Sequence, residues 1–540
     1  MTLALDPSIA VALLYAETHF RFFRFFPNLL FRKFPEVIFD APRRVGPRCD
    51  LPVLLLLSDL VNFPAQCLSV SVSISQPGNS PRLFTFDNIE PCTVVHPFSR
   101  QSSAYVFRIS RQALGSGAIL INCTATIKRG RKTRTILNDN LIGSSKFPFS
   151  CFLAEEPLPG SAMSSLGDVH VHSHYSQSHV EFGPPLIVID EFSKCYGNDF
   201  VAITDHSYDL ACSMDNYLKA DPHIERWKSL HEEADNNDLK NIVVLGEEVS
   251  CLNSKGKVIH LCALGLKNYL PGTLDGGRPV RVGAIQLSLT EAITQSHEQQ
   301  GVTFAAHPGS TMGFMQRFFL KRGNWEQKDY HTSLNGIQGI NNGFGKTWRR
   351  AKSMWIKELL KEHKLTLVAG NDSHGDFNRY RYLSIPFVSI GESFTRHFSY
   401  AMTGIYGKTS SKQDVIQALK QGKTYVTTGP FLCMGFGDSP MESIISQEDI
   451  TLSGRIIAVS LISTKEFGNP WCIRLYCGDL QAHKETCIFQ KFFEVDQYAV
   501  CEKIMPLGQV QRGYLRAEAE CKKTDGAIAY CATSPCYFFK

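Results

Sequence analysis

Gly167-Asp168-Val169-His170-Val171-His172-Ser173-His174-Tyr175-Ser176 is the segment around which the rest of the chain can be understood. An apolar run that ends in His-x-His predicts a β-strand presenting two imidazoles on one face, because alternate side chains of a strand point the same way. Further apolar runs are followed at once by His, Asp or Glu, at residues 202–206, 244–249, 258–260, 304–308 and 368–374. We expect these segments to assemble one polynuclear metal site at the ends of strands.

The overall composition is that of an ordinary globular protein. The 540 residues are 43% hydrophobic and 20% charged, and a chain of this length predicts several domains of about 100–200 residues each. The net charge of +5 slightly favours anionic substrates. Nucleic acid remains a conceivable partner that charge alone does not indicate.

The cysteines and the N-terminus bear on localisation. The 17 cysteines include no C-x-x-C pair, and scattered thiols fit a reducing cytoplasm better than a disulfide framework. The apolar run at residues 9–16 is interrupted by Glu17, so no signal peptide is expected, and no stretch has the length and apolarity of a membrane span. The sequence therefore predicts a cytoplasmic protein without a transmembrane segment.

Four regions follow one another along the chain. Residues 1–36 interleave Phe with Arg and are expected to pack their Phe side chains on the next domain, in preference to forming a membrane-surface or nucleic-acid patch. Residues 37–160 hold short β-like runs between Pro, Gly, Ser and Asn clusters, which predicts a β-sandwich-like domain. Residues 431–540 are again β-like and predict a β-rich C-terminal domain.

Residues 166–430 alternate apolar runs with helix-like stretches. The apolar runs occupy residues 168–172, 200–204, 241–245, 258–264, 301–306, 336–340 and 365–369. Helix-like stretches lie between several of them, which predicts an α/β unit with a parallel, barrel-like sheet. Functional groups of such barrels gather at the C-terminal ends of the strands, where most of these runs carry their His, Asp or Glu.

The residue types indicate which metals the site would hold. Neutral imidazole and carboxylate suit Zn, Mn and Fe, and the absence of Cys at the motif positions argues against a closed structural zinc site. Glu248 and Asp372 are the carboxylates able to bridge two cations. A single histidine is usually structural, but several at strand ends together indicate a shared ligand role.

The same segments resemble the polymerase and histidinol phosphatase (PHP) superfamily. Its four signatures match, in order, His170-Val171-His172, Thr204-Asp205-His206, Glu248 with His260 and His307, and Asp372-Ser373-His374. Residues 414–430 look like the "ALxxGRxYxTxGP" segment of the CehA/McbA-like branch, and residues 513–518 are also similar to that branch. The resemblance covers roughly residues 166–540.

This resemblance implies a fold and a ligand set. The fold would be a distorted (β/α)7 barrel flanked by the two β domains. One divalent cation would be held by His170, His172, Glu248 and Asp372. Glu248 would bridge to a second cation bound by His260 and His307, and His206 with His374 would hold a third. A further family ligand position is occupied here by Gln177, so His179 or His174 would have to replace it, and two or three metal ions are expected.

The expected activity is hydrolysis of a small anionic ester, a phosphate ester above all, by a metal-bound hydroxide. Asp205 and His206 are the candidate catalytic residues, with Asp205 expected to orient the ligand histidine beside it. Two alternatives remain open: hydrolysis of a carbamate or carboxylic ester, as in some relatives of the CehA/McbA-like branch, and a non-catalytic, metal-stabilised binding scaffold. Arginines that could hold an anionic substrate or simply face solvent are Arg349, Arg350, Arg379 and Arg381.

Overall fold

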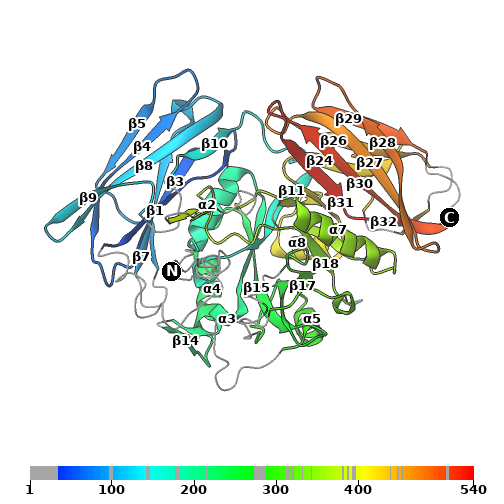
Figure 1. Ribbon diagram of the computed structural model, residues 1–540, viewed down its shortest axis with the longest axis horizontal. Helices are drawn as coiled ribbons and strands as arrows, with labels where there is room; N and C mark the ends of the chain where they lie inside the picture. The colour runs from blue at the N-terminus through cyan, green and yellow to red at the C-terminus, as the bar shows by residue number, and fades with distance from the viewer. Residues whose placement is uncertain are drawn as a thin grey trace, which may run out of the picture.

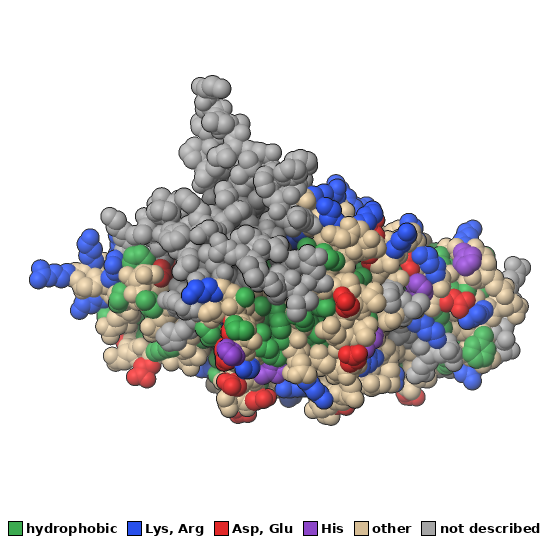
Figure 2. All heavy atoms as spheres, turned by 90° about the horizontal axis from the view of Figure 1, so that it is seen from below, with side chains coloured by type: hydrophobic (Ala, Val, Ile, Leu, Met, Phe, Trp, Pro, Cys, Tyr) green, Lys and Arg blue, Asp and Glu red, His purple; other side chains and the backbone are tan. Residues whose placement is uncertain are grey.

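The computed structural model describes residues 34–95, 101–140, 146–176, 183–214, 216–272, 287–311, 317, 322–330, 333–341, 343–379, 382–385, 388–391, 397–437, 440–446, 449–451, 455–505 and 510–539. A central lobe that carries the helices lies between two β lobes (Figure 1). On the face seen in Figure 2, described basic and acidic side chains are interspersed, in keeping with the small net charge. The prediction for residues 1–36 lies outside the described residues, except for residues 34–36.

The N-terminal lobe consists of two sheets around one apolar core. Alternation buries Val70, Val72 and Ile74 of one strand against Ile121 and Cys123 of its neighbour. The first sheet has the order β1 (Glu36–Asp40), β3 (Leu51–Ser58), β7 (Ser102–Ile109), β6 (Thr93–Val95). The second has the order β2 (Arg44–Val45), β10 (Phe149–Leu153), β8 (Gly117–Arg129), β4 (Gln66–Ser75), β5 (Arg82–Asp87), with β9 (Lys132–Leu137) also on β8.

The central lobe is built on part of a 15-stranded sheet. Its strands in spatial order are β19 (Thr366–Ala369), β18 (Gly336–Ile340), β17 (Val302–Ala305), β16 (Val258–Leu264), β15 (Ile242–Leu252), β12 (Phe200–His206), β11 (Ser164–Val171), β22 (Met402–Tyr406) and β23 (Thr424–Thr427). The helices are α2 (Leu186–Tyr196), α3 (Ser207–Leu210), α4 (Glu225–Asn236), α5 (Leu289–Glu298), α7 (Lys346–Leu359) and α8 (Lys412–Lys420). Two small hairpins pair β13 (Cys212–Ser213) with β14 (Asn216–Ala220) and β20 (Tyr382–Ile385) with β21 (Val388–Gly391).

The predicted (β/α)7 barrel is wrong. The chain is mostly β, and the central strands belong to a mixed sheet in which β15–β16, β16–β17, β11–β22 and β22–β23 all pair antiparallel. A tight turn at residues 253–256, with Gly256 at φ 66°, joins β15 directly to β16, where the barrel required a helical crossover. On its other edge the sheet runs on from β23 into the C-terminal strands.

The C-terminal lobe extends the central sheet and adds a second one. β31 (Ile528–Thr533) pairs with β23, followed by β30 (Arg512–Lys522), β27 (Asn469–Asp479) and β28 (Lys484–Phe492), with β25 (Asp449–Thr451) and β32 (Cys536–Phe539) attached. β24 (Phe431–Phe436), β26 (Ile457–Ile462) and β29 (Ala499–Ile504) form the second sheet, and an apolar core lies between them. Strands from both sides of residue 430, β23 and β31, therefore belong to one hydrogen-bonded sheet. Among the described residues, no helix is long and apolar enough to cross a membrane.

A buried ionic network links this lobe to the central one. The guanidinium of Arg516, on β30, donates to both carboxylate oxygens of Glu485 at 2.7 Å and also to Glu518. Lys352, on α7, donates to Glu518 Oε1 at 3.0 Å. Arg516 and Glu518 are 1% and 2% exposed, so each charge depends on its partners instead of on water.

Acid is expected to weaken the C-terminal lobe through Glu518. Burial alone would raise its pKa, but the charges of Arg516 and Lys352 and the hydrogen bond from Arg516 lower the pKa from 4.5 to about 2. Because the folded pKa lies below the unfolded one, the stabilisation is complete above about pH 4.5 and disappears toward pH 2, an effect on the order of 3 kcal/mol. The free energy of unfolding, measured with urea, should therefore fall more steeply between pH 4.5 and pH 2 in the wild type than in Glu518→Gln. An equal loss of stability in the two proteins over this pH range would contradict the role of Glu518.

Candidate metal centre

The segment after β19 folds back along β11 and brings the chain's two outer motifs together. The amide N–H of Asp372 donates to the carbonyl of His170 at 2.9 Å, and the N–H of His172 donates to the carbonyl of Ser373 at 2.9 Å. Gly370 permits this approach, because a Cβ at that position would lie 2.6 Å from the Cβ of His170. Asp372 itself adopts a left-handed φ of 55°, so its carboxylate is presented by a strained turn.

A first donor group is formed by His170, His172, Glu248 and Asp372. His172 Nε2 lies 3.2 Å from His170 Nε2 and 3.1 Å from Asp372 Oδ1, and Glu248 oxygens lie 3.5 and 3.6 Å from these nitrogens. Four donors at about 2.0–2.1 Å around a tetrahedral cation would stand about 3.3 Å from one another. The spacing and the donor types therefore fit a single divalent cation.

Glu248, on β15, belongs both to the first donor group and to a second one with His206 and His260. The strand register places it opposite His206 of β12, and β16 brings His260 close to it. Its oxygens lie 2.8 Å from His206 Nδ1, 2.6 Å from His260 Nδ1 and 2.8 Å from His307 Nε2. Burial would raise the pKa of Glu248, but the neighbouring histidines, His260 foremost, lower it well below the usual range. Glu248 is therefore an anion within a ring of imidazoles.

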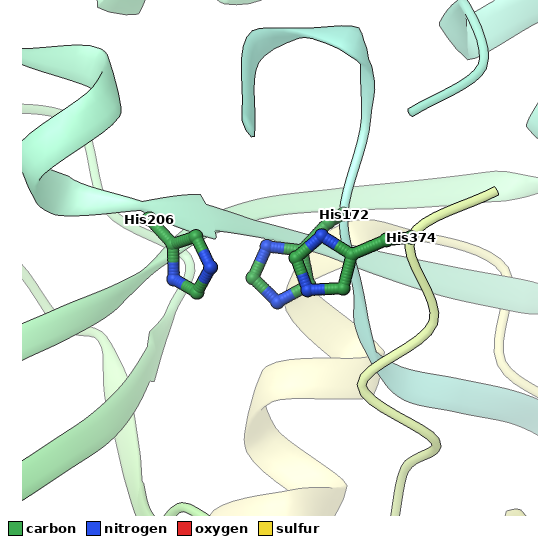
Figure 3. Close-up of side chains that lie close together, drawn as sticks. All are labelled: His172, His206 and His374. Carbon is green, nitrogen blue, oxygen red and sulfur yellow. The ribbon is translucent and has the colours of Figure 1, made fainter. Parts of the chain in front are cut away.

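His172, His206 and His374 form another group (Figure 3). The rings of His172 and His374 stack with centroids 3.9 Å apart and an interplanar angle of 7°, and the ring of His206 lies 4.3 Å from that of His172. Burial, followed by the charges of His374 and His206, lowers the pKa of His172 well below its usual value. A neutral imidazole of this kind keeps a lone pair available for a cation.

His260 lies in a donor group with His206 and Glu248, and it also meets Arg322. The guanidinium Nη2 of Arg322 lies 3.1 Å from His260 Nε2, and a guanidinium can only donate. His260 Nε2 then accepts, which places the imidazole proton on Nδ1, where it is donated to Glu248 at 2.6 Å. In this arrangement His260 holds Glu248 by a hydrogen bond, and its Nδ1 lone pair is not offered to a second ion.

Several other predicted residues lie outside these groups. Asp205 accepts from the backbone N–H and the hydroxyl of Ser173 at 2.8 and 2.6 Å, so it fixes the segment after β11 and is not among the grouped donors. His174 faces Glu233 of α4 at 3.5 Å. Gln177 and His179 fall outside the described residues.

Two charged side chains near the motifs are buried. Glu247, the sequence neighbour of Glu248, is fully buried and accepts from the N–H of Leu270 at 2.8 Å. Arg379 is buried beside Asp376 and Asp139 and supports the loop structure, not an open anion site. Arg349 and Arg350 are exposed on α7, and Arg381 lies outside the described residues.

Gln338, on β18, is a site residue that the motifs did not reveal. Its Oε1 lies 3.0 Å from His170 Nδ1 and accepts from the backbone N–H of His307 at 3.0 Å, while its Nε2 donates to the carbonyl of Gly370 at 2.8 Å. Because Oε1 can only accept, His170 carries a proton on Nδ1 and directs Nε2 into the first donor group. A lone amide within the apolar run 336–340 was the available signal.

Replacing Gln338 with Leu is expected to weaken metal binding about 10–100-fold, the range found for partners that orient ligand histidines. The reason is that the His170 ring and the His307 backbone lose their common acceptor. Gln299→Leu is the matched control, because Gln299 Oε1 also accepts two backbone N–H groups but lies on the surface next to Lys267 and Asn268. Competition titration with a metal indicator measures the difference, and equal affinities in the two variants would contradict the role.

Comparison with known proteins adds no identification. No family model matches the sequence, and no curated protein matches it. A comparison of structures gives a cycloisomaltooligosaccharide glucanotransferase of Paenibacillus sp. in complex with cycloisomaltoheptaose, 9% identical, covering 93% of this chain and 71% of that one with a TM-score of 0.14.

Proposed function

We propose that the protein is a metal-dependent hydrolase acting on small anionic esters, phosphate esters first. One observation supports it: distant parts of the sequence bring a buried set of imidazoles and carboxylates to one place. The donors are His170, His172, His206, Glu248, His307, Asp372 and His374.

The cluster requires positive charge. With the His170 proton on Nδ1, its Nε2 lone pair meets the carboxylates of Glu248 and Asp372, and these groups repel one another unless a cation or a further proton lies between them. Burial would lower the pKa of His170, but Cys262 first, and then the carboxylates of Glu248 and Asp372, raise it well above its usual value. A divalent Zn, Mn or Fe ion in the first donor group would satisfy His170, Glu248 and Asp372 together.

The residues of the site would have different roles around the bound cations. Bound cations supply Lewis acidity and lower the pKa of water. Glu248 and the imidazoles position them, while Gln338 and Ser173 with Asp205 hold the surrounding backbone. Asp372 and His307 are each 10% exposed, whereas the remaining donors are almost fully buried. Substrate would therefore approach past these two side chains.

The test combines metal analysis with a hydrolysis panel. Freshly purified protein is expected to contain a transition metal and, after loading with Zn or Mn, to hydrolyse aryl phosphates faster than aryl carbamates or aryl carboxylic esters. Asp372→Ala should lose both metal and activity. Preference for the carbamates or carboxylic esters would replace the substrate class, and stoichiometric metal without hydrolysis of any substrate would favour a metal-stabilised scaffold.

A further inference from the structure

Two cysteines from different lobes lie close together where the N-terminal lobe contacts the end of α2. Cys49 follows β2 in the N-terminal lobe, and Cys195 lies in the last turn of α2. Cys49 Sγ lies 3.9 Å from the carbonyl oxygen of Lys194, and Cys195 Sγ lies 3.6 Å from the carbonyl oxygen of Asp50. Each sulfur thus sits beside the sequence neighbour of the other cysteine, and the two thiols are close enough to shift one another's pKa.

The backbone holds this arrangement in place. The N–H of Gly46 donates to the carbonyl of Cys195 at 2.8 Å, and the N–H of Cys49 donates to the carbonyl of Gly46 at 3.3 Å. Arg44, just before this turn, is buried and donates to the carbonyl of Tyr196 at 2.7 Å. The turn and the end of α2 are therefore fixed to each other on both sides of the thiol pair.

The two thiols differ in access and acidity. Cys49 is partly exposed, whereas Cys195 is 3% exposed. The hydrogen bond from Cys195, followed by the positive charges of Lys194, Lys240 and Arg44, lowers the pKa of Cys49 from 9 to about 7, against the opposing effect of burial. Burial raises the pKa of Cys195. A partly exposed thiolate beside a buried thiol is the usual arrangement of an oxidisable cysteine and its resolving partner.

We propose that Cys49 and Cys195 form a reversible disulfide when the protein meets hydrogen peroxide. The Cys49 thiolate attacks one peroxide oxygen, an S–O bond forms as the O–O bond breaks, and the leaving hydroxide takes up a proton to become water. The Cys195 sulfur, on losing its proton, then attacks Cys49 Sγ, so that the S–S bond forms, the S–O bond breaks, and a second water leaves. Two thiols are oxidised by two electrons, and one peroxide is reduced to two waters.

The bond would tie the N-terminal lobe to the helix that lies beside the donor groups. Pro184, two residues before α2, accepts from the N–H of His174, and the first residue of the helix, Leu186, donates to Glu233. The disulfide would therefore tie the N-terminal lobe to α2, which is preceded by a residue hydrogen-bonded to the segment that follows β11, whatever chemistry the candidate centre performs.

The test is peptide mapping of the full-length protein. Reduced protein is treated with a small excess of hydrogen peroxide, remaining thiols are alkylated, and the digest is analysed without reductant. We expect a peptide pair linked through Cys49 and Cys195, lighter by two hydrogens than the separate peptides, which dithiothreitol separates. Cys195→Ser should leave Cys49 as a sulfenic acid that dimedone captures, and Cys49→Ser should leave Cys195 unoxidised.

The exposed Cys487 provides an internal control within the same digest. Cys49 is expected to be oxidised first because it combines access with the lowered pKa and has a partner in contact. Oxidation of Cys487 while Cys49 and Cys195 both remain alkylated would overturn the proposal, as would a disulfide from Cys49 to any other cysteine. The wild-type map alone decides between these outcomes, so the result does not depend on either variant folding.

Discussion

Glu248→Gln is expected to lower bound metal and hydrolysis by at least about 100-fold, the upper end of what even orienting residues contribute. Glu248 is the carboxylate shared by the histidines of β11, β12, β16 and the segment after β17. A neutral amide keeps its volume and removes the charge around which they gather. Its NH2 group would moreover direct protons at imidazole nitrogens that should offer lone pairs.

Glu247→Gln is a closely matched control, one residue away on the same strand. The Glu247 side chain points to the other face of β15 and contacts Leu270. Burial raises the pKa of Glu247 well above its usual value, and an amide at this position keeps an oxygen that can accept from the N–H of Leu270. Metal content by mass spectrometry and initial rates measure both variants. Equal metal content in Glu248→Gln and Glu247→Gln would remove the basis for the proposed function.

Arg516→Met is expected to cost about 3–5 kcal/mol of folding free energy, the range for removing one partner of a buried ion pair. The substitution leaves Glu485 and Glu518 without the guanidinium that donates three hydrogen bonds to their carboxylates. It also removes a cation stacked on Tyr476 at 4.2 Å. Urea unfolding followed by tryptophan fluorescence measures the loss.

Arg512→Met is the control on the same strand. Arg512 pairs with Glu362 at 2.6 Å, but the two side chains are 59% and 45% exposed, and such surface pairs contribute about 0–1 kcal/mol. The two variants remove the same kind of group at opposite extremes of burial. Equal destabilisation would mean that the Arg516 network contributes no more than a surface pair.

The strands of the central lobe could be predicted from sequence, but their assembly could not. Apolar runs such as 200–204 and 336–340 lie on β12 and β18, because buried strands need continuous apolar residues. Such runs do not indicate whether a strand lies parallel or antiparallel to its neighbour. The turn at residues 253–256 reverses the chain between Leu252, the last residue of β15, and Val258, the first of β16, and the pattern of apolar runs on either side would look the same with a helical crossover.

The candidate site shows a similar division. His170, His172 and Asp372 could be identified because their motifs follow strands directly, and the structure places their nitrogens and oxygen within 3.4 Å of one another. Gln338 and Arg322 could not, because their roles depend on which ring nitrogen each one meets. That information exists only once β16, β18 and the 322–330 segment are packed together.

The pairing of β23 with β31 has a practical consequence for dissecting this protein. A polypeptide shortened to end at residue 430 would leave the backbone of β23 as an open edge, a template on which other chains can add strands and aggregate. A fragment beginning at residue 431 would carry the complementary edge on β31. Activity or binding studies should therefore keep both parts in one chain, and insolubility of either piece alone would reflect lost strand pairing, not a fault in that piece's own core.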